Sequence, residues 1–294
     1  MALNLKITDS SYYAYAIIKR MNSRYSAGYT ILEVMIVMMV TSALFIATAA
    51  TMSGKQERSE FLTGIRSLES SIQTVASEVS AGHYQNGYQC TASGGSKPNV
   101  DTANATNGPG SNTGCIFLGK VMHFGFNNGL DYNVYTVVGR REASTGGAAT
   151  SLDEAQPVVV EGTGNSPDLT DYKKTDWGIS VTRVIVKGSP DIDVGSIGFL
   201  NQLTGDIAGG NPATGSRSLK LIGVTGTTIS PATSKSATVL EIEATTPTQM
   251  IDAPDGLVMC VTGRNNQKGE INIGGVRGRS TTNVLIDDGV SSAC

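Results

Sequence analysis

Hydrophobic residues are concentrated in one uninterrupted segment near the start of the chain. Residues 31–50 read ILEVMIVMMVTSALFIATAA, and Glu33 is the one charged side chain among them. A helix needs about 20 apolar residues to cross the hydrocarbon core of a bilayer. The pattern therefore predicts a transmembrane helix over residues 29–52.

A helical periodicity continues beyond this segment. Apolar side chains recur at steps of three or four residues, which places them on one face of a helix: Leu62, Ile65, Leu68, Ile72, Val75 and Val79. Charged and polar residues occupy the positions between them. We therefore predict one helix over residues 29–80, whose second half packs its apolar face against the protein's own globular head.

The pattern changes to that of β-structure in the head, residues 81–294. Residues 91–114 are mostly Ser, Gly, Asn, Thr and Pro, which is typical of a loop. Short runs rich in Val, Ile, Tyr and Thr then predict strands: Cys115–Val121, Tyr132–Val138, Pro157–Val160, Gly178–Lys187, Leu219–Val224, Thr238–Glu243, Leu257–Thr262, Glu270–Ile273 and Asn283–Ile286. The expected fold class is α+β, with a long N-terminal transmembrane and amphipathic helix packed on an antiparallel β-sheet or β-sandwich head.

The charges before the apolar segment predict its orientation. The leader, residues 1–28, has four basic residues and one acid, so its net charge is 4 − 1 = +3: Lys6, Lys19, Arg20, Arg24 and Asp9. Positively charged flanks of membrane helices stay on the cytoplasmic side. We expect a single-pass protein with its leader in the cytoplasm and its head outside.

Composition narrows the function classes. Of the 294 residues, 39 % are hydrophobic and 16 % charged, and 35 are glycines. Both shares are below those of a typical soluble domain. A formal net charge of −3 argues against a strongly basic nucleic-acid-binding protein, and two histidines argue against a His-rich metal site. We expect a protein that is not an enzyme and that needs no cofactor or metal.

The start of the apolar segment resembles the signature of type IV prepilins. Residues 28–33 read GYTILE, after a basic leader and before the apolar run. In that family the leader ends in Gly, the next residue is apolar or aromatic, and Glu is fifth after the cleavage point. The resemblance covers about residues 20–80. The leader is longer here than in many pilins, and Tyr29 stands where Phe or Met is commoner.

The resemblance implies processing and assembly. A prepilin peptidase would cut between Gly28 and Tyr29, and the new amine of Tyr29 would be methylated. Glu33 would pair with that amine on a neighbouring subunit and set the axial register of a filament. The implied partners are the peptidase, other pilin or pseudopilin subunits and the inner-membrane assembly platform. The implied location is the cytoplasmic membrane before assembly and a surface pilus or pseudopilus after it.

Three functions remain open. The first is a type IV pilin, more typical of a minor subunit, that serves motility, adhesion or DNA uptake. The second is a pseudopilin of type II secretion, because the order of elements looks like that of the H-class pseudopilin. The third is an exported binding domain or enzyme held by a signal anchor. A cut after Ala49 or an intact Met1 would favour the third.

All four cysteines follow the apolar segment: Cys90, Cys115, Cys260 and Cys294. On the predicted topology they lie outside the cytoplasm, where disulfides persist. Four cysteines allow three pairings. We favour Cys90–Cys115 and Cys260–Cys294, while a zinc site lacks the usual C-x₂-C spacing.

Other motifs give only weak evidence for a binding or catalytic site. Residues 114–121, GCIFLGKV, nearly match a phosphate-binding loop but end in Val121 where the motif needs Ser or Thr. His83 and His123 fit structural or exposed positions better than catalytic ones. The acidic pairs Asp191/Asp193 and Asp287/Asp288 would supply oxygens to calcium, but solvated turns explain them better.

Four basic residues gather near the C-terminus within 16 residues: Arg264, Lys268, Arg277 and Arg279. Residues 278–281 resemble half of the Gly-Arg-x-Arg form found in some DNA-uptake pilins, but the second arginine is missing. Such a group would give weak, salt-sensitive DNA binding. A solvated hairpin face is the alternative.

Overall fold

The structure is a computed structural model. It describes residues 29–82, 88–92, 97–101, 114–160, 171–188, 190–203, 219–224, 250–274, 282–286, 289–292 and 294, with the backbone alone at 50–54, 126 and 127. The chain forms two compact units, Met1–Lys55 and Gln56–Cys294. The expected leader and the expected strand at 238–243 lie outside the described residues.

A single long helix, α2, spans Ile31–Ala81 and confirms the helix predicted over residues 29–80. It ends where Gly82 takes a φ of 69°, a left-handed conformation that glycine adopts without strain. The Gly82 N–H donates to the Val79 carbonyl oxygen at 2.9 Å and so closes the last turn.

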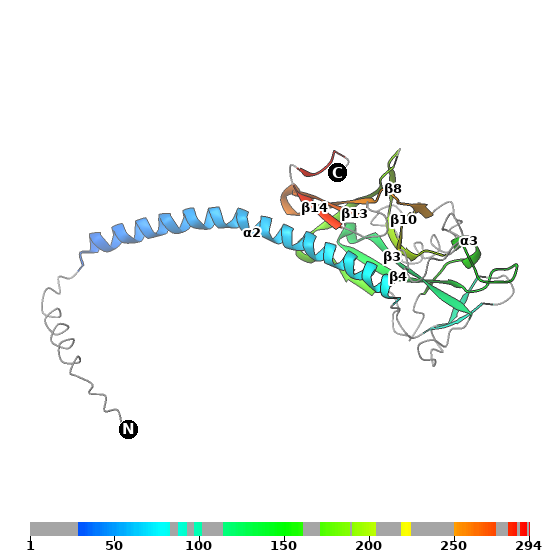
Figure 1. Ribbon diagram of the computed structural model, residues 1–294. Coiled ribbons are helices and arrows are strands. Elements are labelled where there is room, and N and C mark those ends of the chain that lie inside the picture. Colours follow the sequence, from blue (N-terminus) through cyan, green and yellow to red (C-terminus); the bar gives the residue numbers. More distant parts are fainter. Residues whose placement is uncertain are drawn as a thin grey trace, which may run out of the picture. The chain divides into compact units, whose positions relative to one another are not determined.

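The larger of the main sheets has seven antiparallel strands (Figure 1). Their order is β11-β10-β9-β3-β4-β5, and β6 also pairs with β4. The strands are β3 (Cys115–Phe126), β4 (Asp131–Arg140), β5 (Val158–Val160), β6 (Asp171–Lys174), β9 (Ser196–Asn201), β10 (Leu219–Val224) and β11 (Met250–Asp252). The central strand β4 is buried along its whole length, and its buried residues include the polar side chains of Asp131, Asn133, Thr136 and Arg140.

The second main sheet has five antiparallel strands in the order β14-β13-β12-β7-β8. They are β7 (Ser180–Val186), β8 (Ile192–Val194), β12 (Leu257–Thr262), β13 (Lys268–Ile273) and β14 (Thr282–Ile286). A separate pair joins β1 (Gln89–Thr91) to β2 (Asn99–Asp101). Short helical turns complete the described elements: α3 (Leu152–Ala155), η1 (Asn127–Gly129), η2 (Asp176–Gly178) and η5 (Arg264–Asn266). The fold class is therefore α+β with mostly antiparallel sheets.

One core joins the second half of α2 to both main sheets. The helix contributes Ala76 and a set of side chains that recur at steps of three or four residues: Phe61, Ile65, Leu68, Ile72, Val75 and Val79. The expected stripe is therefore corrected at its start, because Phe61 is buried and Leu62 is half-buried. Phe61 precedes Ile65 by four residues and continues the alternation of four-residue and three-residue steps that keeps side chains on one face.

Glycines let α2 approach the second sheet closely. A Cβ at Gly263 would collide with the ring of Phe61, and a Cβ at Gly269 would collide with Cδ1 of Ile65. Gly263 directly follows β12, and Gly269 is the second residue of β13. The helix therefore packs into a trough that larger residues at these two positions would fill.

A charged contact also holds the helix on the first sheet. The Lys120 ammonium of β3 bonds the Glu78 carboxylate at 2.5 Å, and Lys120 is buried while Glu78 keeps 34 % of its side chain exposed. Burying a lone ammonium would be costly. The pair therefore ties the last turns of α2 to the middle of β3.

Several strands differ from the sequence prediction. Residues 91–114 were expected to be a loop, but Thr91 and Asn99–Asp101 belong to β1 and β2. Strands β6, β8, β9 and β11 were not predicted. In β9 the sequence is interrupted by Gly198, which usually weakens a strand, but here Ile222 of β10 lies where a Cβ would be.

Candidate functional site

The first turn of α2 holds the residues that resemble the prepilin signature. Thr30 caps the helix, because its hydroxyl oxygen accepts the Glu33 N–H at 3.2 Å and its carbonyl oxygen accepts the same N–H at 3.0 Å. Thr30 and Glu33 thus have the spacing of a capping box. A carboxylate in the first turn also interacts favourably with the helix dipole. The helix therefore starts with a cap from Thr30, which a search for Ser/Thr-x-x-Glu would have found, and the Glu33 carboxylate contributes through the helix dipole.

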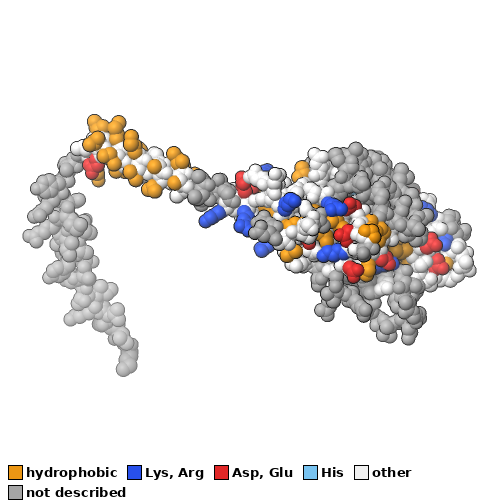
Figure 2. Space-filling model, turned by 90° about the horizontal axis from the view of Figure 1, so that it is seen from above, with side chains coloured by type: hydrophobic (Ala, Val, Ile, Leu, Met, Phe, Trp, Pro, Cys, Tyr) orange, Lys and Arg blue, Asp and Glu red, His pale blue; other side chains and the backbone are white. Residues whose placement is uncertain are grey.

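The segment after this turn is apolar and exposed. Among the described residues, one helix is long and apolar enough to cross a membrane, at Ile31–Ala49. Its large side chains are exposed, from 46 % at Val34 to 81 % at Ile31. Figure 2 shows hydrophobic side chains gathered along this stretch. The extent agrees with the predicted 29–52 span, although the side chains of residues 50–54 are outside the description.

The hydroxyl groups of this segment are satisfied within the helix. Thr41 donates to the Val37 carbonyl oxygen at 2.8 Å, Ser42 to that of Met38 at 2.7 Å, and Thr48 to that of Leu44 at 3.0 Å. A polar group in hydrocarbon is costly unless it has such a partner. Glu33 is the exception, since its carboxylate bonds to no residue that the structure describes.

Two disulfides lie in the head, with the pairing favoured from the sequence. Cys90–Cys115 joins β1 to the start of β3, with Cα atoms 6.0 Å apart. Cys260–Cys294 joins β12 to the C-terminus, with Cα atoms 5.3 Å apart. All four cysteines are therefore paired. Disulfides of this kind typically stabilise a fold by about 2–4 kcal/mol.

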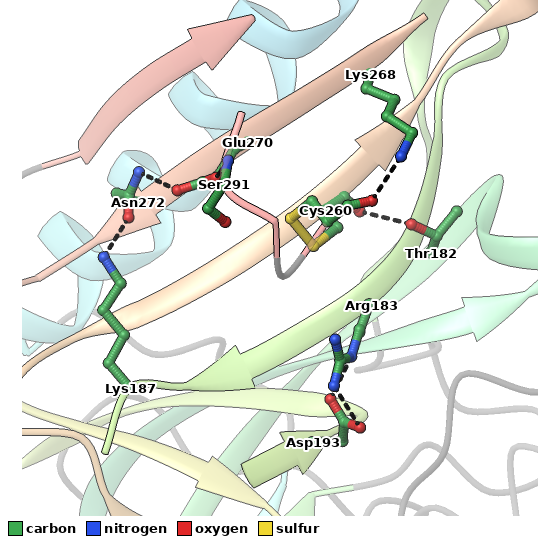
Figure 3. Close-up of a disulfide and its surroundings, with 10 residues drawn as sticks. Thr182, Arg183, Lys187, Asp193, Cys260, Lys268, Glu270, Asn272 and Ser291 are labelled. Carbon is green, nitrogen blue, oxygen red and sulfur yellow. Dashed lines mark hydrogen bonds and ion pairs between the residues drawn. A yellow bond between two sulfur atoms is a disulfide. The ribbon is translucent and has the colours of Figure 1, made fainter. Parts of the chain in front are cut away.

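The C-terminal residues are held on the outer side of the second sheet (Figure 3). The Ser291 N–H donates to the buried carboxylate of Glu270 at 2.7 Å, and the Lys268 ammonium donates to the Cys294 carbonyl oxygen at 3.0 Å. Burial alone would raise the pKa of Glu270, but the hydrogen bonds from Ser291 and Asn272 outweigh it and lower the pKa. The C-terminus is thus fixed by a covalent bond and by charge-assisted hydrogen bonds.

The structure describes two of the four candidate DNA-binding residues, Arg264 and Lys268, at either end of the turn between β12 and β13. Arg264 lies exposed in η5, and Lys268 is engaged with the C-terminal carbonyl group. Arg277 and Arg279 lie outside the described residues. DNA binding stays a prediction without a described surface.

The remaining candidate residues that the structure describes take part in contacts within the head. His123 is buried beside Ser196 of β9, with Nδ1 and Oγ 2.8 Å apart, and burial lowers its pKa to about 4. Asp193 forms an ion pair with Arg183, with oxygen–nitrogen distances of 2.5 and 3.0 Å. Residues 115–121, the interior of the near phosphate-loop motif, lie within strand β3. His83, Asp287 and Asp288 lie outside the described residues.

Comparisons with known protein families, curated proteins and solved structures find no match to this chain. The case for a function therefore rests on the chain's own residues, and above all on the start of α2.

Proposed function

We propose that this chain is a prepilin-like structural subunit. It is cleaved between Gly28 and Tyr29, held in the cytoplasmic membrane by the apolar part of α2 and assembled by helix packing into a type IV pilus. A pseudopilin of type II secretion is the related alternative, with the same processing. One observation carries the proposal: Glu33 lies in the first turn, fifth from Tyr29, at the head of an exposed apolar segment that runs to Ala49.

The apolar segment suits both a bilayer and a filament core. Its hydroxyl groups are satisfied by the helix itself, so they need no partner from lipid or from another subunit. Lipid tails are as apolar as the side chains they contact, and helix association in such surroundings is driven by packing and polar pairs. The transfer of the helix from the bilayer to the filament therefore gains little free energy from hydrophobic burial. A specific polar pair then has a large influence on how the helices associate.

Glu33 is the residue that supplies this pair. After cleavage the Tyr29 amine would carry a positive charge, and a carboxylate from a neighbouring subunit would neutralise it in low dielectric. A carboxylate left unpaired among apolar helices is costly. One charge pair per subunit then fixes the axial position of each helix.

Variants of the first turn separate this role from helix capping. Glu33→Gln keeps a side chain that suits the capping box but removes the charge. Thr30→Ala removes the cap and keeps the charge. We expect Glu33→Gln to be processed normally and to enter fibres poorly, and Thr30→Ala to enter them nearly as well as the natural chain. The reverse order would mean that the cap at Thr30, and not the charge of Glu33, controls entry into fibres.

Processing itself is tested by the N-terminal sequence and mass of the protein from its native cells. A methylated Tyr29 start is the expected result. A start at Ala50 or Thr51 would mean ordinary secretion, and Met1 at the N-terminus would mean a signal anchor. Either of these would overturn the proposal.

A further inference from the structure

Three side chains form a hydrogen-bonded row on the outer face of the second sheet (Figure 3). The Lys187 ammonium donates to Oδ1 of Asn272 at 2.6 Å, and Nδ2 of Asn272 donates to the Glu270 carboxylate at 2.7 Å. The ammonium thus binds a neutral amide, and the carboxylate binds the other end of the same amide. An amine, a carboxamide and a carboxylate are therefore held in direct sequence.

The alternation of side chains along a strand brings this row to one face. On β13 the residues on both sides of Asn272 are buried in the core shared with α2, so Asn272 and Glu270 lie on the opposite face. Lys187 directly follows β7, and its N–H donates to the Gly256 carbonyl oxygen at 3.0 Å. Because β12 lies between β7 and β13, the Lys187 side chain reaches across β12 to Asn272.

Glu270 is fixed in place within the row. It is 2 % exposed, and its second oxygen accepts the Ser291 N–H at 2.7 Å. Burial alone would raise the pKa of Glu270, but the hydrogen bonds from Ser291 and Asn272 and the nearby charge of Lys187 lower it. Glu270 is therefore a carboxylate, which is the form that accepts a proton as a general base.

The lysine nitrogen is close to the carbon of the amide. A carbonyl bond is about 1.2 Å long, so an Nζ that is 2.6 Å from Oδ1 lies within about 3.8 Å of Cγ. Reacting atoms that are aligned for attack are about 3–3.5 Å apart. Lys187 is exposed, and its flexible stem allows this small approach. Holding two reacting groups together in one chain replaces a collision between two molecules.

We propose that Lys187 and Asn272 form an isopeptide bond, with Glu270 as the catalytic residue. Glu270 takes a proton from the Lys187 ammonium, and the neutral Nζ attacks Cγ of Asn272. Glu270 passes the proton to Nδ2, the Cγ–Nδ2 bond breaks as the Nζ–Cγ bond is completed, and ammonia leaves. The ammonia carries away the second proton that Nζ loses, as ammonium. The reaction therefore needs no oxidant and no further reactant, and Glu270 ends as a carboxylate.

The bond would join β7 to β13, two strands that are not neighbours in the sheet. It lies on the same face as the Cys260–Cys294 disulfide, which joins β12 to the C-terminus. Together the two covalent bonds tie three strands and the end of the chain. This inference does not depend on the proposed function, because only residues of the head take part.

The test is a tryptic digest of the full chain purified from its native cells, reduced and analysed by mass spectrometry. Trypsin does not cut after a lysine whose amine is in an amide bond. We expect one branched peptide that joins residues 184–217 to residues 269–277 and is lighter by one ammonia molecule than its two parts. A chain without the bond gives residues 184–187, 188–217 and 269–277 as three separate peptides.

Variants assign the roles of the three side chains. Lys187→Arg keeps a positive donor but removes the nucleophile, because a guanidinium does not lose its proton in proteins. Glu270→Gln keeps the size and an acceptor oxygen but removes the base. Both should lack the branched peptide and unfold at a lower temperature than the natural chain. Lys268→Arg is the matched control on β13, and it should keep the bond. Formation of the Cys260–Cys294 disulfide reports in each variant that the sheet has folded.

Three results would overturn the proposal. Separate peptides from the natural chain, with the Cys260–Cys294 disulfide formed, would show that the row is a set of hydrogen bonds and nothing more. Loss of ammonia from residues 269–277 that persists in Lys187→Arg would show that Asn272 closes a ring on its own backbone. An undiminished branched peptide in Glu270→Gln would remove Glu270 from the reaction.

Discussion

The contact between Gly269 and Ile65 gives a direct test of how α2 packs on the head. Ile65 is fully buried, and a Cβ at position 269 would collide with its Cδ1 atom. The next atom, Cζ of Phe61, would be 3.2 Å away, which is tight but tolerable after a small shift. The clash therefore involves one methyl group at the end of a fully buried side chain.

Gly269→Ala should destabilise the protein by about 1–3 kcal/mol, the usual cost of overpacking a core. Ile65→Val removes the Cδ1 methyl group, and alone it should cost about 0.5–1.5 kcal/mol. In the double variant the new Cβ fills the space that Cδ1 leaves. We therefore expect the double variant to be more stable than the sum of the single changes predicts, by about 1 kcal/mol or more, which is a typical coupling for residues in contact.

The assay is urea unfolding of the full chain in a mild detergent, followed by circular dichroism of the β-structure. A cycle of the natural chain, the two single variants and the double variant gives the coupling energy. A matched control pairs Gly269→Ala with Val186→Ala, at the far end of β7. That pair should be additive. Additivity of Gly269→Ala with Ile65→Val as well would refute the close approach of helix and sheet.

Two further predictions concern buried charge. Because burial lowers the pKa of His123 from 6.5 to about 4, the unfolded chain binds the proton more tightly. Stability should be complete above pH 6.5 and decrease as the pH falls toward 4, by at most about 3 kcal/mol. His123→Gln should flatten the dependence of stability on pH over that range, and an unchanged curve would contradict the burial of His123. The stability that the lowered pKa of Glu270 contributes would be lost at a lower pH. For the ion pair, Glu78→Gln should cost about 1–3 kcal/mol, and Lys120→Met should cost less, because only the first leaves a buried ammonium without its partner. Equal costs in thermal unfolding would contradict this order.

The sequence predicted the elements whose pattern is set locally. The helix is visible because its first part is apolar on all sides and its second part repeats every three to four residues. Strands Leu219–Val224 and Leu257–Thr262 were predicted to the residue, since both are apolar and bounded by turn residues. The polar strand β6, DYKK, gave no such signal, because it lies at an edge and exposes alternate side chains.

The features of the candidate site likewise divide into those that the sequence predicts and those that only the structure shows. Residues 28–33, the apolar segment and the cysteines are recognisable from residue types and spacing, because membrane insertion and proteolytic cleavage depend on short contiguous segments. The capping hydrogen bond at Thr30 was not predicted, although the spacing Ser/Thr-x-x-Glu would have indicated it. The pairing of Lys268 with the C-terminal carbonyl group was not, because the two groups are 26 residues apart.

The sequence alone therefore determined a long helix, its apolar half and a β-rich head, since hydrophobic periodicity is a property of neighbouring residues. Only the tertiary structure decided which strands share a sheet, that Gly263 and Gly269 make room for the helix, and that the Lys187 side chain reaches Asn272 across β12. These features arise from contacts between residues distant in the chain. Steric fit and burial, which fix such contacts, leave no local pattern in the sequence.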